Sequence, residues 1–235
     1  MSDLERAQAC LGRDKLRYMD MLEPLRRGSV DVLHAWDDGV LLHDTGCGGW
    51  FTAANSTDAL ERMLDLLPAG TELFVGHEPE HKERVAERLG LRDGHTCYQA
   101  AWMGKALPPL PVDAPPLTRL GAEWAEFVHE HYSHSFADVE YMRGALERGM
   151  LGVFVDDKLA GYIGTHDEGT MGMLEVLPAY RRRGLGELLT LGAIRQALDE
   201  GRYAFDQVIE GNEASFALQR KIGMEICDKP MYWLY

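Results

Sequence analysis

The stretch Thr170–Gly186, TMGMLEVLPAYRRRGLG, decides how the C-terminal half of the chain is built. Its first part, Met171–Leu177, predicts a strand that Pro178 ends. The glycine-containing segment that follows opens a predicted helix over Gly184–Leu198. A strand that runs through such a turn into a helix leaves the first helical amides without partners, and the helix dipole then favours an anion such as a pyrophosphate.

Positive charge gathers at the same turn. The 235 residues include 24 Lys and Arg against 38 Asp and Glu, a formal net charge of −14, yet Arg181, Arg182 and Arg183 stand together before Gly184. Gly184 and Gly186 let the backbone approach a phosphate with no Cβ in between. The bare pattern Arg-x-x-Gly-x-Gly also fits a solvated arginine run beside glycines that only tighten a turn. The surrounding sequence must therefore decide between these interpretations.

The overall composition excludes several classes of partner. A strongly acidic chain repels nucleic acid and anionic membranes at long range. No stretch approaches the roughly 20 apolar residues that span a bilayer, and the charged N-terminus lacks the apolar segment of a signal peptide. The four cysteines, Cys10, Cys47, Cys97 and Cys227, are scattered, so they indicate neither a zinc site nor a disulfide framework. We expect a soluble, cytoplasmic protein with no metal, no nucleic-acid partner and no membrane partner, and with a homodimer as one form of assembly.

Strands and helices alternate on both sides of the deciding stretch. Helical segments over Gly121–Arg148 come first, followed by two strands joined by a hairpin turn at Asp156-Asp157-Lys158. The remaining predicted elements, in chain order around the deciding stretch, are strands Leu151–Val155 and Leu159–Thr165, strand Ala204–Ile209, helix Glu213–Ile222 and strand Met231–Tyr235.

The N-terminal half repeats this order. An amphipathic segment over Asp3–Leu22 leads to a hairpin whose turn is Asp37-Asp38-Gly39. The predicted elements after the first segment are strands Val30–Trp36 and Val40–Thr45, helix Thr57–Leu67, strand Thr71–Gly76, helix Glu80–Leu89 and a strand near Tyr98–Met103. The proline-rich stretch Leu107–Leu117 follows. We predict an N-terminal domain 1–106, a linker 107–117 and a catalytic domain 118–235, with the two domains related as a degenerate tandem repeat.

A second motif lies on the last predicted helix, where Asn212, Ser215, Leu218 and Gly223 recur at fixed spacing. Together with Leu174, Val176, Pro178, Arg181, Gly184 and Gly186, it resembles the GNAT N-acetyltransferase superfamily. The motifs of that family are Leu-x-Val-x-Pro-x-x-Arg/Gln-x-x-Gly-x-Gly and Asn-x-x-Ser/Ala-x-x-Leu-x-x-x-Gly-Phe, and Met224 here replaces the Phe. The resemblance covers residues 117–235 and is nearest to the glycine N-acyltransferase-like branch.

The resemblance implies a GNAT acyltransferase fold, with a mixed α/β sheet flanked by helices, in a degenerate tandem of two halves. It implies acetyl-CoA or another acyl-CoA as co-substrate, with the pantetheine arm between the strands that end at Leu177 and Ile209. The implied cofactor-binding residues are Leu174, Val176, Arg181, Arg182, Arg183, Gly184, Leu185, Gly186, Asn212 and Ser215. The amides of Arg182–Gly186 would hold the pyrophosphate. Asn212 is explained equally well as a plain helix cap.

The resemblance also implies an acid and a base. Many family members carry a tyrosine acid where this chain has Gln219, and a base where it has Thr170. Glu168 shares the strand parity of Thr170, so we expect it to be the catalytic base, and Glu175, of opposite parity, is the second catalytic candidate. Either carboxylate can instead be a solvated turn or strand residue. Asp206 is expected to be an ordinary exposed strand residue.

The expected function is therefore that of an enzyme, an acyl-CoA-dependent N-acyltransferase that moves an acetyl group to a small-molecule or peptide amine by direct attack. The alternative is a non-catalytic acyl-CoA-binding or sensing module, which Gln219 favours. A phosphate-loop nucleotide enzyme is disfavoured because no Gly-Lys-Ser/Thr follows the glycines. His129, His131 and His134 do not share one helix face, so they do not predict a metal site.

Overall fold

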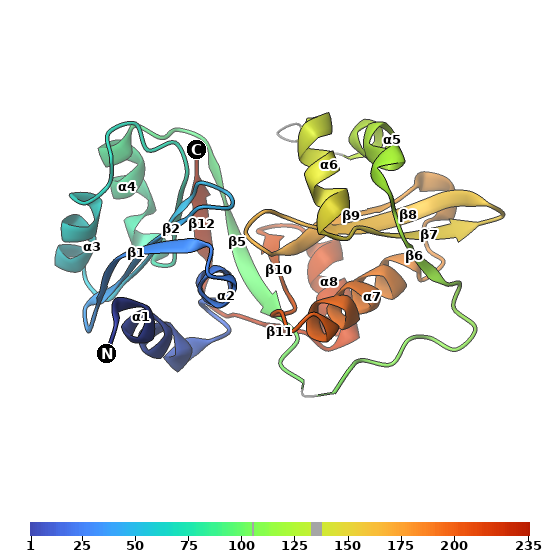
Figure 1. The fold of residues 1–235 in the computed structure, drawn as a ribbon, viewed down its shortest axis with the longest axis horizontal. Helices are drawn as coiled ribbons and strands as arrows, with labels where there is room; N and C mark the ends of the chain where they lie inside the picture. The colour runs from blue at the N-terminus through green and yellow to red at the C-terminus, as the bar shows by residue number, and fades with distance from the viewer. Residues whose placement is uncertain (105, 133–137) are drawn as a thin grey trace. The chain divides into compact units, whose positions relative to one another are not determined.

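The computed structural model describes residues 1–104, 106–132 and 138–235, and these form two compact units (Figure 1). Unit 1 contains Met1–Ala101, Gln207–Phe216 and Glu225–Tyr235. Unit 2 contains Trp102–Asp206 and Ala217–Met224. The last strands of the chain therefore belong to the unit that the N-terminal half begins.

The N-terminal half has the predicted elements in the predicted order, with one strand, β3, that the prediction lacks. They are α1 (Asp3–Leu11), α2 (Met19–Arg27), β1 (Val30–Trp36), β2 (Gly39–Asp44), β3 (Trp50–Ala54), α3 (Thr57–Leu64), β4 (Phe74–Gly76), α4 (Lys82–Leu89) and β5 (Gly94–Ala101). The amphipathic segment Asp3–Leu22 is not one helix, because α1 ends at Gly12 and a short 3₁₀ turn separates it from α2. Gly12 has the low helix propensity that favours such an end.

The sheet of unit 1 is completed by strands from the end of the chain. Its order is β1-β2-β3-β4-β12-β5-β10, and β11 also pairs with β5; the late strands are β10 (Phe205–Ile209), β11 (Glu225–Ile226) and β12 (Met231–Leu234). Tyr232 of β12 pairs with Gly76 on one side and with Thr96 on the other. The pair β3 and β4 is parallel, and β2, β4 and β5 each have an antiparallel neighbour, so the sheet is mixed.

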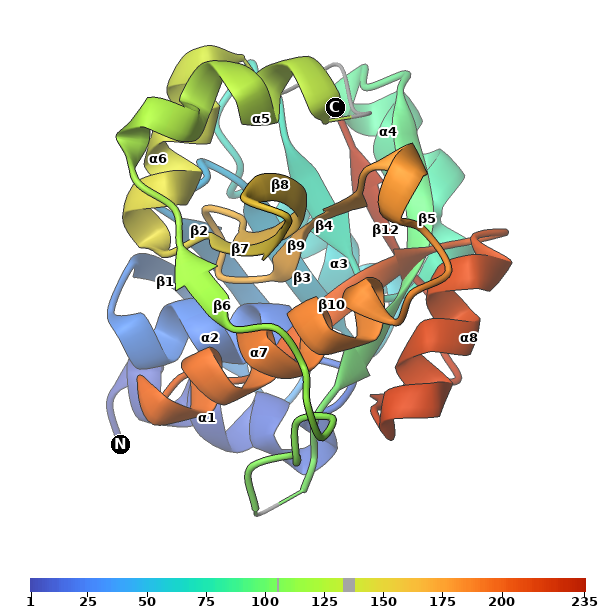
Figure 2. The same ribbon diagram turned by 90° about the vertical axis from the view of Figure 1, so that its right-hand side faces the viewer.

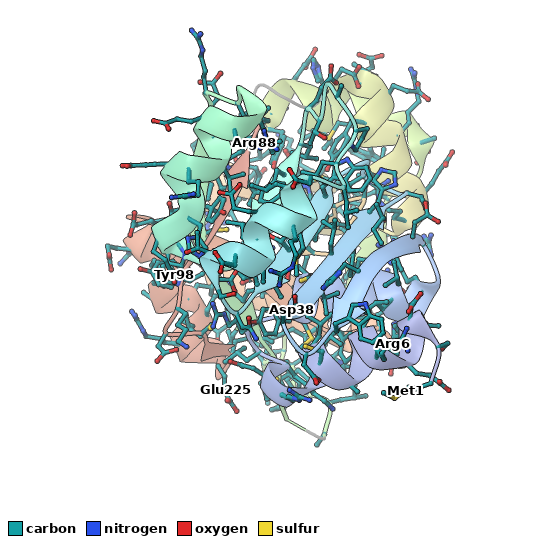
Figure 3. The ribbon with its side chains drawn as sticks, turned by 90° about the vertical axis from the view of Figure 1, so that its left-hand side faces the viewer. Met1, Arg6, Asp38, Arg88, Tyr98 and Glu225 are labelled. Carbon is teal, nitrogen blue, oxygen red and sulfur yellow. The ribbon has the colours of Figure 1, made fainter. Side chains whose placement is uncertain are left out.

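Helices cover unit 1 on both faces. In Figure 3, α3 and α4 lie in front of the strands, and Asp38 and Arg88 mark the hairpin turn and α4. A hydrophobic cluster joins these helices to the sheet and includes Leu60, Met63, Val85, Leu41 and Tyr232. Consecutive residues Val40–Leu42 of β2 are all buried, which requires cover on the opposite face as well, and α1 packs there against β1 and β2.

The C-terminal half repeats the order after its own leading helices. Its elements are β6 (Leu117–Arg119), α5 (Ala125–His131), α6 (Val139–Arg148), β7 (Leu151–Val155), β8 (Lys158–Thr165), β9 (Met171–Val176), α7 (Leu185–Asp199), β10 and α8 (Glu213–Ile222). Residues 133–137 of the predicted helical segment, which include His134, lie outside the described part of the chain. The predicted hairpin is confirmed, and Asp156 and Asp157 both have the left-handed φ of a two-residue type I′ turn.

Unit 2 holds a four-stranded antiparallel sheet in the order β6-β7-β8-β9. Figure 2 shows α5 and α6 on one side of it and α7 on the other. Val128, Met142, Leu146, Tyr162 and Met173 pack between the first two helices and the sheet. The two halves share one order of strands and helices, so the predicted fold class, a mixed α/β tandem, is confirmed. Across the described residues, no helix combines the length and the apolar character needed to cross a bilayer.

Candidate functional site

The N-terminus of α7 is open in the way the sequence predicts. Gly184 is its N-cap, has φ +78°, and makes no side-chain capping hydrogen bond. The first hydrogen bond of the helix runs from Leu188 N to Gly184 O at 3.1 Å, so the amides of Leu185, Gly186 and Glu187 lie before it. Leu185 itself is 6% exposed and anchors this turn in the core. An anion placed here would meet unpaired amides and the positive end of a 15-residue helix.

The backbone before the helix forms a concave turn. Arg182 and Gly184 both have left-handed φ values, +63° and +78°, on either side of Arg183. Alternating backbone conformations of this kind point successive N–H groups toward one side, as in anion-binding nests. No atom lies within 4 Å of the position that a Cβ on Gly184 would occupy, so there is room for a ligand.

The three arginines of the turn are exposed, and two of them are held in place. Arg181 Nε donates to Val176 O at 2.9 Å, which ties the turn to the end of β9. The guanidinium of Arg183 lies 5.6 Å from the centre of the Tyr180 ring. These cations therefore stand at the entrance to the open helix end, where they favour an anion.

Strand β9 contains a β-bulge beside this turn. Glu175 pairs with Tyr162 and Gly172 pairs with Gly164, so three steps along β9 match two steps along β8. The extra residue lies at Met173–Leu174, and Met173 has an unusual φ of +54° although its side chain is buried. A bulge leaves backbone groups of one strand outside the ladder, so amides of β9 become available to a ligand near Leu174 and Val176.

The bulge corrects the predicted orientation of Glu175. Tyr162 and Gly164 lie two residues apart and share one face of β8, so their partners Glu175 and Gly172 share that face too. Thr170 has the parity of Gly172. The prediction that Glu175 lies on the opposite face of the strand from Thr170 is therefore wrong, because the inserted residue shifts every later side chain of β9 to the other face.

The carboxylates of Glu168 and Glu175 lie near a group of tyrosines in unit 2. We call this group, Tyr132, Tyr141 and Tyr162, the tyrosine cluster. Burial raises the pKa of Tyr132 most, and the charges of Glu175 and Glu168 raise it further. Burial and Glu168 likewise raise the pKa of Tyr141, and burial and Glu175 raise that of Tyr162. Glu168 and Glu175 therefore both lie near Tyr132, and the three phenols keep their protons at neutral pH.

Glu168 lies in an anchored turn. It is 8% exposed, in the turn between β8 and β9. Asp167 forms an ion pair with Arg148, whose Nε donates to Thr165 O at 2.9 Å, and His166 Nδ1 lies 2.6 Å from the Tyr141 hydroxyl. Thr170 is buried, and its hydroxyl has no hydrogen-bond partner among the described residues. The turn thus holds Glu168 in place beside a strand with an unsatisfied polar group.

The second motif is a helix cap in this structure. Asn212 Oδ1 accepts a hydrogen bond from Ser215 N at 3.1 Å at the start of α8. Asn212 is exposed and Ser215 is half-buried. Both belong to unit 1, whereas the other predicted cofactor-binding residues, from Leu174 to Gly186, belong to unit 2. The capping interpretation of Asn212 is confirmed, and a cofactor contact stays a prediction.

In unit 1, the counterpart of the open start of α7 is the start of α3, where side chains of the same unit already bind backbone amides. The N-cap Ser56 accepts a hydrogen bond from Ala59 N at 3.2 Å, so α3 begins with a side-chain cap. Glu78 Oε2 accepts from Ala54 N at 3.2 Å, and Arg17 pairs with the same carboxylate at 3.2 Å. A cavity of about 640 Å³ adjoins this ion pair, with Tyr18 in its wall. The helix start that follows β3 therefore does not offer the open amides of α7.

Sequence reasoning missed the tyrosine cluster and a polar pair, Asp206 and Gln219. Asp206 is half-buried with a shielded Oδ1, so the expectation of an exposed strand residue is wrong. Tyr132 directly follows α5, Tyr141 lies on α6 and Tyr162 lies on β8, with no shared spacing, so no local pattern could have grouped them. Trp124, Phe127 and Tyr132 pack against the core of unit 2. His131 stacks on Phe127 with ring centres 4.1 Å apart.

Comparison with known proteins agrees with this geometry. Residues 150–234 match the model of the FR47-like protein family. A Drosophila protein of 18% identity has a TM-score of 0.77, covering 100% of this chain and 96% of that one. A GNAT-family protein from Novosphingobium aromaticivorans has a TM-score of 0.59 at 19% identity, covering 100% and 97%. A GCN5-related N-acetyltransferase from Kribbella flavida has a TM-score of 0.55 at 16% identity, covering 93% and 94%. No curated protein matches the sequence. The chain has the GNAT fold.

Proposed function

We propose that this protein is an acyl-CoA-dependent N-acyltransferase that moves an acetyl group from acetyl-CoA to a primary amine by direct attack. One observation carries the proposal: the bulge of β9 adjoins the open N-terminus of α7. Val176 Cγ2 and Leu218 Cδ2 each lie 3.9 Å from the position of a Cβ on Gly186, so strand, helix start and α8 converge there.

Coenzyme A fits the groups that converge at this place. Its diphosphate suits the amides of Leu185, Gly186 and Glu187, and Arg181–Arg183 add charge at the entrance. Its pantetheine arm carries amides that suit the backbone groups freed by the bulge near Leu174 and Val176. When bound, an acyl-CoA supplies an activated thioester carbonyl to the site.

Proton transfer falls to the two carboxylates. An alkylamine has a pKa near the lysine value of about 10.4, so it must lose a proton before it can attack at neutral pH. Glu168 and Glu175 lie near Tyr132 in one unit, and either can accept that proton directly or through water. Their negative charge also favours an ammonium-bearing acceptor, either a small molecule or a peptide. The segments Leu177–Arg181 and Asn212–Ala214 support a place near the glycine N-acyltransferase-like branch.

The test is a panel of acyl-CoA donors and amines scored by release of free thiol. Acetyl-, propionyl- and longer acyl-CoA should be compared with and without each amine. Amine-dependent thiol release with acetyl-CoA is the expected result. Binding of acetyl-CoA with no release in the presence of any amine would contradict transferase activity.

A second candidate is a non-catalytic acyl-CoA-binding or sensing module. Gln219 favours it, because this buried side chain on α8 has no ionisable group of its own. The same panel separates the two functions, since a sensing module binds acyl-CoA without consuming it.

A further inference from the structure

A cavity of about 640 Å³ lies within unit 1, because every residue of its wall belongs to that unit. It begins where the parallel strands β3 and β4 stop pairing, at Thr52 and Gly76. Beyond that pair, Ala53, Ala54 and Glu78 line the cavity. Its volume is in the range of about 300–1,000 Å³ that small-molecule sites occupy. The proposed transfer reaction leaves this cavity without a role.

The least exposed charged side chains of the wall are Arg17 and Glu78, which we call the floor pair. Their side chains are 14% and 10% exposed, and Arg17 Nη2 donates to Glu78 Oε1 at 3.2 Å. Glu78 Oε2 accepts from Ala54 N at 3.2 Å. A carboxylate has about four lone-pair positions, so Glu78 can accept further hydrogen bonds. Among the described residues, both side-chain hydrogen bonds of Arg17 come from Nη2, so the N–H groups of Nη1 remain for another acceptor.

The floor pair is held from behind. Arg17 Nη2 also donates to His77 O at 2.6 Å, and Arg17 O accepts from Gln99 Nε2 at 3.2 Å. His77 and Gln99 are both buried in the core of unit 1. A binding group whose position is fixed before the ligand arrives loses little entropy on binding. The floor pair therefore offers a preorganised cation beside a preorganised anion.

Tyr18 adds an uncharged donor next to the floor pair. The Arg17 guanidinium lies 5.3 Å from the centre of the Tyr18 ring, and that ring lies 5.1 Å from the His77 ring. The Tyr18 hydroxyl makes no hydrogen bond within the part of the chain that the structure describes. Burial, followed by the charge of Glu78, raises the pKa of Tyr18 to about 12, so the phenol keeps its proton at neutral pH. This hydroxyl can therefore donate a hydrogen bond to a carboxylate.

The exposed rim of the cavity has charges of both signs. They are the cations Arg13 and Lys229 and the carboxylates Asp14, Asp37, Glu80 and Asp228. The excess of carboxylates opposes a ligand that carries only negative charge, such as a diphosphate. A ligand that carries only positive charge would meet the guanidinium of Arg17 at the floor. A ligand with both charges side by side complements the floor pair and is tolerated by the rim.

We propose that unit 1 binds a free α-amino acid in this cavity. Its ammonium group lies against Glu78, and its carboxylate lies between Arg17 Nη1 and the Tyr18 hydroxyl, so each charge of the ligand meets an opposite charge in a partly buried place. The small residues Gly39 and Ala53 in the wall leave room for the side chain of the amino acid. This inference goes beyond the proposed function and is independent of it, because no acyl-CoA group and no residue of unit 2 takes part.

Ligands that differ only in charge test the proposal. The full chain is titrated calorimetrically with the standard L-amino acids, and the tightest binder is compared with its decarboxylated amine and its deaminated acid. For phenylalanine these are phenethylamine and 3-phenylpropionate. We expect both analogues to bind at least about tenfold more weakly, because each lacks one partner for the floor pair. Equal affinity of the amino acid and either analogue, or no binding of any amino acid at up to about 10 mM, would overturn the proposal.

Two variants locate the ligand. Glu78→Gln keeps the shape and an acceptor for Ala54 N but removes the negative charge, and it should weaken binding by at least about tenfold. Tyr18→Phe removes one hydroxyl and should weaken binding by about two- to tenfold. Glu87→Gln on α4 and Tyr235→Phe, both at exposed positions, are the matched controls and should bind as the wild type does. An unchanged affinity in both cavity variants would place the amino acid elsewhere and overturn the proposal.

Cys10 provides a measurement on the wild-type protein. Its side chain lies in the cavity wall, whereas Cys47, which is also partly exposed, does not line the cavity. A saturating amino acid should slow the alkylation of Cys10 by iodoacetamide, followed peptide by peptide with mass spectrometry, and should leave the rate at Cys47 unchanged. An unchanged rate at Cys10 would contradict binding in this cavity. None of these measurements involves acyl-CoA, so a protein that transfers no acyl group can still pass or fail them.

Discussion

At the scale of single residues, the carboxylates of unit 2 show how position along a strand determines chemistry. Glu168 is fixed by its turn, and Glu175 reaches the same side because of the inserted residue in β9. Both act on the pKa of Tyr132. The proposed reaction therefore has two candidate acceptors for the proton of the amine instead of one.

Replacing Glu168 by Gln should lower turnover by at least about tenfold to a hundredfold near neutral pH, because a positioned base contributes about that much or more. The defect should shrink at high pH as the amine deprotonates in solution. Acetyl-CoA affinity should be retained, as measured by calorimetry, and Glu147→Gln at an exposed position is the control. Wild-type turnover in Glu168→Gln with none in Glu175→Gln would instead assign the base to Glu175.

The buried hydrogen bonds of His77 determine its protonation state. Its Nδ1 lies 2.7 Å from Thr52 O and its Nε2 lies 2.9 Å from Asp20 Oδ1, all within the buried core of unit 1. Both partners are acceptors, so both ring nitrogens donate and the imidazole is charged. Burial alone would lower the pKa of His77, but the charge and hydrogen bond of Asp20 outweigh it and the pKa is raised.

Stability should therefore depend on pH through His77. A raised pKa means that the contribution is complete below the unfolded value of about 6.5 and is lost as pH rises through the folded value. Urea unfolding at successive pH values should show the free energy of unfolding falling across that window. At pH values below that window, His77→Gln should be less stable than the wild type by about 3 kcal/mol, and its free energy of unfolding should change less steeply with pH. An equally steep slope in the variant would assign the pH dependence to another group.

At the scale of elements, the start of α7 carries the expected cofactor site. Gly184 has a positive φ, an open surrounding and no capping side chain, and Gly70 in unit 1 has a φ of +80° and an equally open surrounding. The two glycines thus share backbone strain and openness, and only Gly184 belongs to the predicted cofactor site. They form a matched pair for mutation.

Gly184→Asp should weaken coenzyme A binding by at least about tenfold, because it places a carboxylate against the diphosphate. Gly70→Asp should leave the affinity unchanged and should show a similar shift in melting temperature. Calorimetric titration with coenzyme A measures both. Equal affinities for the two variants would exclude the α7 turn as the diphosphate site.

At the scale of the whole molecule, the last strand of the chain completes the first sheet. β12 lies between β4 and β5, and Met231, Tyr232 and Leu234 are 1%, 1% and 3% exposed. Removing a central strand exposes two strand edges and the apolar surface beneath them. The N-terminal half alone therefore lacks part of its own core.

Deleting Met231–Tyr235 should abolish cooperative unfolding of unit 1, because each buried side chain lost costs about 2–5 kcal/mol against a total of about 5–15. Hydrogen exchange should show the loss at β4 and β5. Deletion of Tyr235 alone, which is 52% exposed, is the control and should have little effect. A truncated protein that melts within a few degrees of the intact chain would show that β12 is dispensable.

The whole chain should bind one coenzyme A. In unit 1, Ser56 caps α3 and Glu78 accepts the Ala54 amide, so the groups that would meet a diphosphate are already satisfied. Calorimetry with the full-length protein should give a stoichiometry of one. A value of two would mean that Glu78 gives way to a ligand.

The sequence by itself determines the local features of this protein. The hairpins, the helix starts and ends, the repeated order of elements and the open glycine turn before α7 follow from residues within a few positions of one another, because turn, cap and periodicity depend on near neighbours. Only the tertiary structure decided the rest. The register of β8 against β9 sets the face of Glu175, the insertion of β12 completes the first sheet, and the fold brings Gln219 to a hydrogen bond with Asp206. Each of these depends on contacts between residues that are distant in the chain, and such contacts leave no mark in local periodicity.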